Sequence, residues 1–385
     1  MKGLDKLFES AKEAEVSANR SGDTTVPGDE PSDVEAPLTP QALKDEKSDG
    51  FIVEPCPPNH LYLLDPAVFH QKTKPATGSI RNDTQIRLRN LLLQHKHLAE
   101  PYLLKGYPSD MAQRWRRIRT NFPNFSDVID LLAKRYALAS LRQDTPVLFP
   151  PILLLGDPGV GKTAFCTALS KEIGLYFGEI PLAGLTEAFT ISGLDIGWSS
   201  GNPGRVFEHI SAAGHANPLL LLDEVDKCGR GGTGGDPHAP LHILLERHTA
   251  KRFEDIAIRM HADMSWINWI ATANIPEDIP SSLLSRFRKV EVPKPSREQM
   301  SAVIRSIYAN KRENIPNGDL FVHRLDDNII TLLQDLTPRE AGLVIEEAMG
   351  AAAQRPRQRR KLRIVPDDLV LPAITAKKSI GFFPK

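Results

Sequence analysis

The sequence predicts an α/β fold, in which a parallel sheet carries helices on both faces and a small α-helical domain follows it. The runs Ile152–Leu155 and Leu219–Leu222 are apolar without polar alternation, as expected for strands that are buried on both faces. Between residues 146 and 294 such runs alternate with helical patterns, which favours a parallel sheet. After Pro293-Lys294-Pro295 the patterns become purely helical, over Arg297–Asn310, Asp326–Leu336 and Pro338–Ala353.

The overall charge and the apolar content narrow the class of protein. The 385 residues include 48 Lys+Arg and 48 Asp+Glu, so no net charge steers the chain towards nucleic acid or an anionic membrane. No apolar run approaches the roughly 18 residues of a membrane helix, and acids stand where a signal peptide needs an apolar core. Three widely spaced cysteines (Cys56, Cys166 and Cys228) form neither a disulfide framework nor a metal site. We therefore expect a cytoplasmic protein without a membrane partner.

Composition divides the chain into four segments. Residues 1–50 have few large apolar residues and are expected to be a disordered leader, with a short partner-docking helix as the alternative. Residues 51–145 are expected to form a helical N-terminal extension that packs on the core. Its helices are predicted over Ile86–His97 and Ser126–Leu141, with Ser126 as a cap. The remaining segments are the α/β domain at 146–294 and the α-helical domain with a C-terminal tail at 295–385.

A glycine-rich motif directly follows the strand at Ile152–Leu155 and precedes a helical run at Ala164–Glu172. It consists of Gly156, Asp157, Pro158, Gly159, Val160, Gly161, Lys162 and Thr163. In this context the glycines let backbone N–H groups surround a phosphate, and the helix N-terminus adds positive potential. Lys162 is expected to bridge the β- and γ-phosphates, and Thr163 to place its hydroxyl on Mg²⁺. The strand and helix on either side favour this function over a purely structural turn.

Two acids, Asp223 and Glu224, end the strand at Leu219–Leu222. The carboxyl edge of a parallel sheet is where ligands bind. Asp223 is therefore expected to belong to the Mg²⁺ shell, and Glu224 to orient and deprotonate the attacking water. The alternative is that these acids begin a solvated turn, but the nearby phosphate loop favours catalysis. The pair predicts hydrolysis rather than binding alone.

Together these motifs resemble AAA+ ATPases, and the Lon-type ATPase module in particular. The resemblance covers about Phe149 to Ala353. Further short segments support the resemblance: Asn217-Pro218, Gly235-Asp236-Pro237, Ala271-Thr272-Ala273-Asn274, Ile279-Pro280 and Leu283-Leu284-Ser285-Arg286. It implies a P-loop AAA+ nucleotide-binding domain followed by a helical lid, with ATP and Mg²⁺ as cofactors. It also implies a homo-oligomer, a hexamer, that acts on protein substrates.

The resemblance assigns roles to further residues. Asn274 matches the sensor-1 position beside the γ-phosphate, delivered by a strand at Trp266–Thr272. Arg286 matches the arginine finger that reaches the nucleotide of a neighbouring subunit, and Arg288 is the alternative. Arg339 matches sensor 2, which would link nucleotide state to movement of the lid.

Trp198 matches the aromatic residue with which such proteins grip a threaded polypeptide. The segment Trp198–Arg205 aligns with the family's aromatic-x-Gly-x-x-Pro-Gly-Arg pattern and departs from it at Ser200. The alternative is that Trp198 tucks under its own loop. About 30 residues follow Ala353, too few for the family's peptidase domain, so we do not expect proteolysis by this chain.

The favoured function is thus an ATPase that remodels or unfolds proteins. One alternative is a DNA-associated motor or loader. Its candidate contacts would be the basic segments Arg114–Arg119 and Arg355–Arg363, which are more commonly solvated faces. The other alternative is a nucleotide-dependent switch or scaffold with little turnover.

His95 and His97 are two apart on a predicted helix, so they are expected to diverge rather than bind a metal. Gly229–Gly235 is predicted to be a flexible loop.

Overall fold

The apolar runs form the centre of a five-stranded parallel sheet in the computed structural model. The structure describes residues 52–75, 83–142, 144–229, 235–355 and 361–372. In spatial order the strands are β4 (Phe177–Pro181), β5 (Leu219–Asp223), β8 (Asn268–Ala273), β3 (Ile152–Leu155) and β9 (Arg288–Glu291). All four ladders are parallel. The predicted parallel α/β fold is confirmed, although the predicted strand at 266 begins two residues later.

The strand order brings three separate sequence motifs to one edge of the sheet. β3 lies between β8 and β9, and Leu155 pairs with Ala273 at the carboxyl end. β5 lies on the other side of β8, with Leu222 opposite Ala271. Because all strands run in the same direction, the segments that follow β3, β5 and β8 are neighbours. This edge is where ligands of parallel sheets bind.

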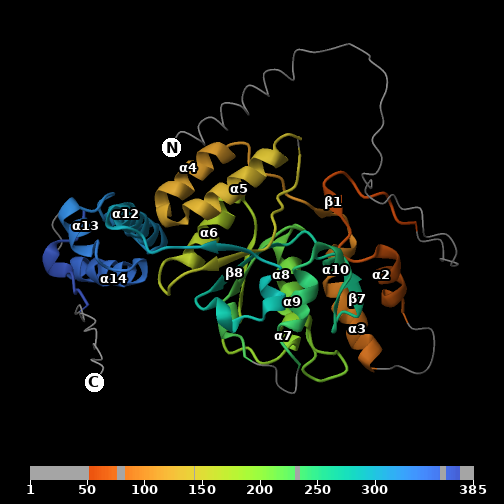
Figure 1. The fold of residues 1–385 in the computed structure, drawn as a ribbon. Helices are drawn as coiled ribbons and strands as arrows, with labels where there is room; N and C mark the ends of the chain where they lie inside the picture. The colour runs from red at the N-terminus through yellow and green to blue at the C-terminus, as the bar shows by residue number, and fades with distance from the viewer. Residues whose placement is uncertain (1–51, 76–82, 143, 230–234, 356–360, 373–385) are drawn as a thin grey trace, which may run out of the picture.

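Alternate strand residues build two apolar layers, one on each face of the sheet. Ile152 and Leu154 pack with helices α4 (Met111–Asn121), α5 (Ser126–Ala139) and α6 (Lys162–Ile173). On the other face, Leu153 and Leu220 pack with α8 (Arg205–Ala213) and α9 (Ala239–Leu244). Figure 1 shows the helices arranged around the strands. Burial on both faces explains why β3 and β5 lack polar alternation.

The part of the N-terminal segment before α4 packs beside α8 and a small hairpin. Its elements are β1 (His60–Leu61), α2 (Pro66–Thr73), α3 (Asp83–Gln94), the 3-10 helix η1 (Lys96–Ala99) and β2 (Tyr102–Leu103). β1 pairs with β2 in an antiparallel ladder. Leu64 bridges to Ala262 in the hairpin formed by β6 (Phe253–Asp255) and β7 (Met260–Ala262). Residues far apart in sequence therefore form one wall of the molecule.

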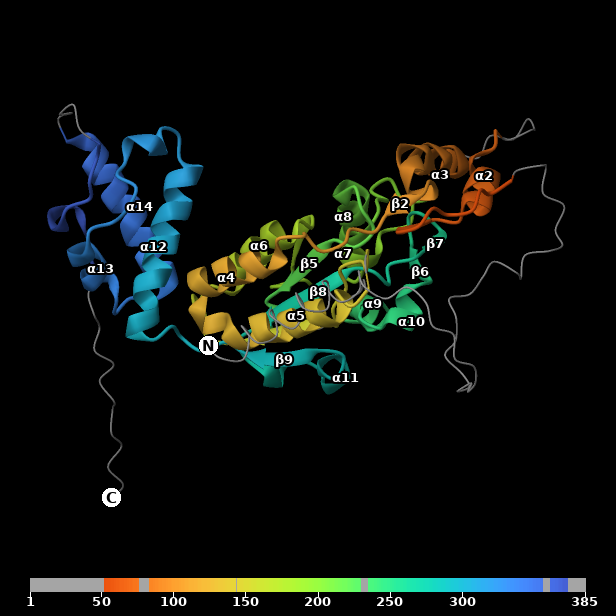
Figure 2. The same cartoon turned by 90° about the horizontal axis from the view of Figure 1, so that it is seen from above.

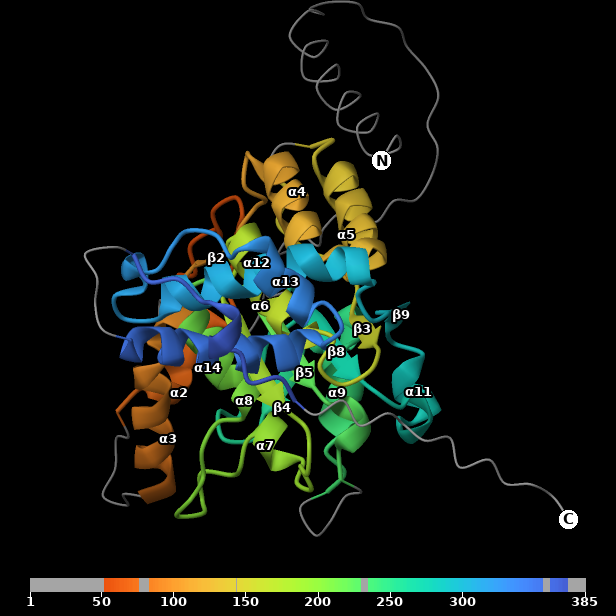
Figure 3. The ribbon, with the colours of Figure 1, turned by 90° about the vertical axis from the view of Figure 1, so that its left-hand side faces the viewer.

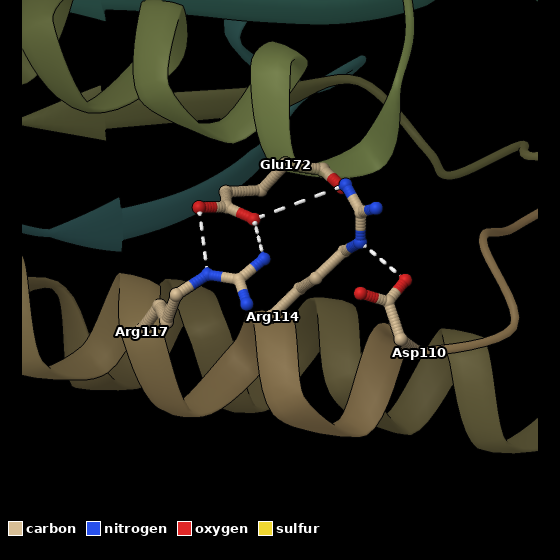
Figure 4. A network of polar contacts seen from close by, with 4 residues as sticks. All are labelled: Asp110, Arg114, Arg117 and Glu172. Atoms are coloured by element: carbon tan, nitrogen blue, oxygen red, sulfur yellow. Dashed lines mark hydrogen bonds and ion pairs between the residues drawn. The ribbon is translucent and has the colours of Figure 1, made fainter.

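Ion pairs hold α4 on the helix that follows the phosphate loop. Glu172, near the end of α6, lies 2.7 Å from Arg117 Nη2, and its backbone oxygen accepts from Arg114 Nη1 at 2.9 Å. Arg114 also donates to Asp110 at 2.5 Å. Figure 4 shows this network across the two helices. Nearer the start of α6, Phe125 stacks on Phe165 at a centroid distance of 4.3 Å.

Two local predictions in this segment are wrong. Ser126 is not a cap, because the 3-10 turn η2 (Pro123–Phe125) runs directly into α5 and leaves Ser126 with helical φ and ψ of −50° and −44°. The helix predicted over 86–97 ends at Gln94. His95 Nδ1 and His97 Nε2 therefore do not diverge; they lie 2.8 and 3.2 Å from the Ser211 hydroxyl of α8. The side-chain contacts with α8 hold residues 95–97 outside the helix that their sequence pattern predicts.

Three helices form a second, smaller unit with its own apolar core. They are α12 (Arg297–Asn314), α13 (Asp327–Leu333) and α14 (Pro338–Gln354), with 3-10 turns η5 (Gly318–Leu320) and η6 (Pro366–Asp368). Capping boxes at Ser296 and Thr337 begin α12 and α14 by satisfying free N–H groups. Figure 2 shows this unit beside the sheet domain.

Short elements complete the connections. They are α7 (Phe189–Ser192), η3 (Val225–Lys227), α10 (Arg247–Ala250), η4 (Pro276–Asp278) and α11 (Ser281–Leu284). Among the described residues, no helix combines the length and the apolar character needed to span a bilayer.

Candidate nucleotide site

The phosphate loop connects β3 to α6, and its lysine reaches the end of β8. Gly161 precedes α6 with φ of 102°, a left-handed conformation that glycine adopts without strain. The Lys162 ammonium donates to the Gly156 carbonyl at 2.5 Å and to Asn274 Oδ1 at 2.7 Å. Burial lowers the pKa of Lys162, and the nearby carboxylates of Asp226 and Asp223 oppose that shift. The structure thus brings the two predicted residues Lys162 and Asn274 into contact.

The predicted acids lie beside the loop. Thr163 Oγ1 donates to Asp223 Oδ1 at 3.4 Å. Thr272, at 1% exposure, donates to the same Asp223 oxygen at 2.6 Å and accepts from the Glu224 backbone N–H at 2.9 Å. Glu224 has φ of 56°, an unusual value for a residue other than glycine. Sequence reasoning gave no role to Thr272, which lies in β8 two residues before Asn274.

Asp226 is a second residue that sequence reasoning missed. Its side chain is fully buried, and its Oδ2 accepts from the backbone N–H groups of Asn274 and Ile275, both at 3.1 Å. Its other oxygen, Oδ1, has no hydrogen-bond partner among the described residues. The residue was visible only as a third acid after β5. The contacts show that it fixes the chain at Asn274.

A cavity of about 1120 Å³ opens at this edge of the sheet. Its walls include the loop at 158–163, both acids, Thr272 and Asn274. The small helical unit contributes Arg339, which packs against Gly159. Figure 3 shows α12 and α14 in front of the strand ends. Phe122 and Asn124 also line the cavity, although the sequence had given their segment no chemistry.

The two candidate finger arginines lie elsewhere. Of the described residues that line the cavity, none is Arg286 or Arg288. Arg286 lies 2.8 Å from Glu246 Oε1 and donates to the Ser282 carbonyl at 2.5 Å. Arg288 is exposed at the amino end of β9, opposite the first residue of β3. Neither arginine is therefore placed to act on the nucleotide of its own subunit.

Trp198 also lies outside the cavity. It is 67% exposed, so the alternative in which it tucks under its loop is wrong.

Several arginines of the two basic segments have acidic partners. In the segment 114–119, Arg114 and Arg117 contact Glu172, and Arg119 contacts Asp130. In the segment 355–363, Arg355 pairs with Asp368 and Arg363 pairs with Asp326. Its residues 356–360 lie outside the described part of the chain, as do 230–234 of the predicted glycine-rich loop.

The fold and this site define a P-loop nucleotide-binding protein. A parallel sheet ends in a phosphate loop, an acid pair and a polar strand end around one cavity, and a helical unit closes over it. Those are the parts that an NTP-hydrolysing enzyme of this class requires.

Comparisons with known proteins specify the class further. Residues 152–294 match the family model described as "ATPase family associated with various cellular activities (AAA)". Over 285 residues the chain is 30% identical to Lon protease homolog 2, peroxisomal, of Xenopus laevis, covering 72% of this chain and 29% of the relative. It is 28% identical to the Lon protease of Lawsonia intracellularis over 282 residues, covering 69% and 34%. Residues 152–294 thus form an ATP-binding AAA ATPase domain, within a Lon-like AAA+ module.

A solved structure supports the fold. The Saccharomyces cerevisiae Hsp104:casein complex, in its extended conformation, is similar with a TM-score of 0.51 at 16% identity. The similarity covers 70% of this chain and 51% of that chain. The chain spans about a third of the length of the two Lon proteases. What it shares with them is the ATPase part.

Proposed function

We propose that this chain is one subunit of a homo-hexameric ring that hydrolyses ATP with Mg²⁺ in order to remodel or unfold protein substrates. The observation that carries the proposal is the convergence of Lys162, Asp223, Glu224 and Asn274 at one cavity. A second loop, outside that cavity, presents the exposed Trp198. Separate sites for hydrolysis and for substrate are what a motor needs. The compartment that we propose is a reducing cytoplasm, where its three free thiols would persist.

The donor set fits Mg²⁺. The Thr163 hydroxyl and the Asp223 carboxylate are oxygen donors 3.4 Å apart, and hard cations prefer oxygen. These two residues would hold the ion, which would neutralise charge on the phosphates. Thr272 fixes the orientation of Asp223 through its short hydrogen bond.

The remaining residues divide the chemistry between binding and proton transfer. Lys162 would exchange its present acceptors for phosphate oxygens. Glu224 would take the proton of the attacking water, and Asn274 would position that water. Arg339 would respond from the helical unit to the nucleotide state. Arg286 would leave Glu246 and stabilise charge at the site of a neighbouring subunit.

Protein substrates are favoured over nucleic acid. The relatives that match the ATPase part are named proteases, which act on proteins. The arginines of the segment 114–119 that are described with acidic partners, such as Arg117 with Glu172, have little charge left for phosphates. An exposed aromatic residue contacts unfolded polypeptide without sequence specificity, as a general remodelling enzyme requires.

The proposal is tested with two substitutions in the full chain. Glu224→Gln should lower steady ATP hydrolysis by about 10²- to 10⁴-fold while ATP binding persists, because only the base is lost. Trp198→Ala should retain ATP hydrolysis and lose unfolding of a tagged model protein. Leu141→Ala, which truncates another exposed apolar side chain, is the control.

Three results would count against the proposal. A wild-type oligomer that binds ATP without turnover would favour a switch or scaffold. Stimulation by DNA but not by protein would favour a nucleic-acid motor. Equal unfolding by wild type and Trp198→Ala would remove Trp198 from the substrate path.

A further inference from the structure

The loop that carries Trp198 is held at both ends by one short hairpin. This Trp198 loop, residues 193–204, joins α7 to α8. Its own backbone bonds, from Leu194 N–H to the Asn202 carbonyl at 2.9 Å and from Gly201 N–H to the Trp198 carbonyl at 3.1 Å, close it into a defined shape. The hairpin is β6–β7, whose turn comprises residues 256–259. Neither segment lines the nucleotide cavity.

The first attachment is a buried carboxylate at the base of the loop. Asp255 is 0% exposed, and its Oδ2 accepts from the Gly204 N–H at 2.7 Å. A side chain at Gly193 would place its Cβ 2.4 Å from Asp255 Oδ1, so the carboxylate fills the space between the two ends of the loop. The Ile256 N–H donates to the Ser192 carbonyl at 2.8 Å. Both ends of the loop therefore rest on two consecutive residues of the hairpin.

The second attachment lies closer to Trp198. Arg259 Nη2 donates to both carboxylate oxygens of Asp195, each at 2.8 Å. The same carboxylate accepts from the Gly197 N–H at 2.7 Å, one residue before Trp198. Arg259 has φ of 53°, a conformation that non-glycine residues keep only where surrounding contacts fix them. The ion pair thus links the hairpin turn to the backbone beside the exposed ring.

The third attachment comes from the N-terminal segment. Arg87 of α3 donates through Nη2 to the Ser199 carbonyl at 3.2 Å, directly after Trp198. The same segment meets the hairpin, since the Asp263 N–H donates to the Leu63 carbonyl at 2.9 Å. The hairpin and α3 therefore support the loop from two directions.

We propose that Asp255 and Arg259 are positioning residues for substrate engagement, which hold the Trp198 loop in the orientation that grips polypeptide, with Arg87 as an additional brace. The inference rests on the proposed function. A loop that transmits force to a substrate must be rigid, because a flexible loop would deform instead of moving the substrate. Sites of this kind depend on surrounding residues that lock the contacting side chain. Here those residues lie more than fifty positions away in the chain.

The test uses Arg259→Ala and Asp195→Asn in the full chain, with Trp198→Ala beside them. We expect basal ATP hydrolysis within about twofold of wild type, and substrate unfolding lowered at least about tenfold, because small misplacements of a working group have large effects. In the double variant Trp198→Ala/Arg259→Ala, unfolding should be no lower than in Trp198→Ala alone. Non-additivity of this kind shows that Arg259 acts through Trp198. Arg305→Ala, which breaks a similar ion pair with Asp327 at 2.9 Å, is the matched control.

A second readout does not depend on any substrate. Hydrogen exchange at the amides of Gly197 and Trp198, which both donate to Asp195, should accelerate at least about tenfold in Arg259→Ala, because their acceptor residue becomes mobile. If Trp198→Ala impairs unfolding but Arg259→Ala does not, the inference is wrong and the proposed function stands. If exchange accelerates but Trp198→Ala unfolds substrate normally, the proposed function fails and the inference falls with it.

A general loss of stability is separated by the milder variant Arg259→Lys, which keeps the charge but not the two-oxygen contact. Intermediate exchange and intermediate unfolding in this variant would support the inference. Equal effects of Arg259→Ala on basal hydrolysis and on unfolding would overturn it.

Discussion

Both edges of the central sheet are polar, but the polar groups at one edge are buried whereas those at the other line a cavity. At the amino edge His215, Asn217 and Asn268 are all 0% exposed. At the carboxyl edge Lys162 and Glu224 line an open cavity. Both edges contain residues that the resemblance had highlighted. The surroundings of these residues, rather than their residue types, distinguish structural residues from candidate catalytic residues.

At the amino edge the buried groups bond to backbone. Asn217 Nδ2 donates to the Lys105 carbonyl at 2.8 Å and to the Val147 carbonyl at 3.0 Å. Asn268 accepts from the Phe149 N–H at 3.0 Å. These bonds join the segment before β3 to the sheet. Asn217 is therefore a structural residue, although it belongs to the strings that carry the family resemblance.

At the carboxyl edge the polar groups are incompletely satisfied or strained. Asp226 Oδ1 is buried with no hydrogen-bond partner among the described residues, and Glu224 has a positive φ. Such features persist where function requires them. Fully buried and hydrogen-bonded polar groups thus stabilise the fold at the amino edge, whereas the polar groups that line the cavity stay accessible to a ligand.

The strongest loss of hydrolysis is expected for an arginine near the amino edge. If Arg286 serves the carboxyl edge of a neighbouring subunit, Arg286→Ala should lower ATP hydrolysis by the assembled protein at least about 10³-fold. Arg288→Ala should change it only a few-fold. Steady-state hydrolysis is measured at a protein concentration that gives the assembled form.

Mixing subunits provides the control for this prediction. Arg286→Ala subunits have an intact Glu224, and Glu224→Gln subunits have an intact Arg286, so their mixture should regain hydrolysis. A mixture that stays inactive, or a larger loss in Arg288→Ala, would contradict the assignment to Arg286.

A smaller effect is expected inside the carboxyl edge. Thr272→Val keeps the shape of the side chain but removes both hydrogen bonds that orient Asp223 and Glu224. We expect hydrolysis to fall by about 10- to 100-fold, as when an outer partner of a metal ligand is lost. Thr331→Val, which removes an exposed hydroxyl bonded to its own helix, is the control. Unchanged hydrolysis at saturating Mg²⁺ would show that Thr272 is only structural.

The parts of the site that local pattern predicted are contiguous residues, whereas Asn274 and Arg339 were predicted from the family resemblance. The phosphate loop and the pair Asp223-Glu224 combine residue type with position at a strand end, so local pattern suffices. Thr272 and Asp226 contribute through contacts between strands, which the pattern does not contain. The placement of Phe122 at the cavity depends in the same way on packing, here of α4 against α6.

The wrong predictions have the same origin. Ser126 has the residue type of a cap, but the 3-10 turn before it determines its backbone. His95 and His97 were expected to diverge on one helix, but that helix ends at Gln94 and both rings contact the Ser211 hydroxyl. The sheet itself was predictable because burial on both faces leaves an unbroken apolar run. Contacts between distant segments, such as Arg259 with Asp195, leave no such pattern.

The last prediction concerns the amino edge and changes only the stability of the protein. His215 Nε2 accepts from the Tyr176 N–H at 2.9 Å, which requires an unprotonated nitrogen. Burial, with a smaller contribution from Lys105, lowers the pKa of His215 to about 4 from 6.5. Unfolding therefore takes up a proton between pH 6.5 and 4. The free energy of unfolding should fall as pH falls through this window, by up to about 1.4 kcal/mol per pH unit from this group.

His215→Gln isolates that contribution, since other titrating groups remain the same in both proteins. We expect the variant to show a shallower decline than wild type when denaturant unfolding is followed at several pH values between 7 and 4. Its ATP hydrolysis at pH 7 should match wild type, because the residue lies at the opposite edge from the cavity. Parallel pH profiles for the two proteins would show that His215 titrates alike when folded and unfolded, and changed hydrolysis would mean that the two edges are coupled.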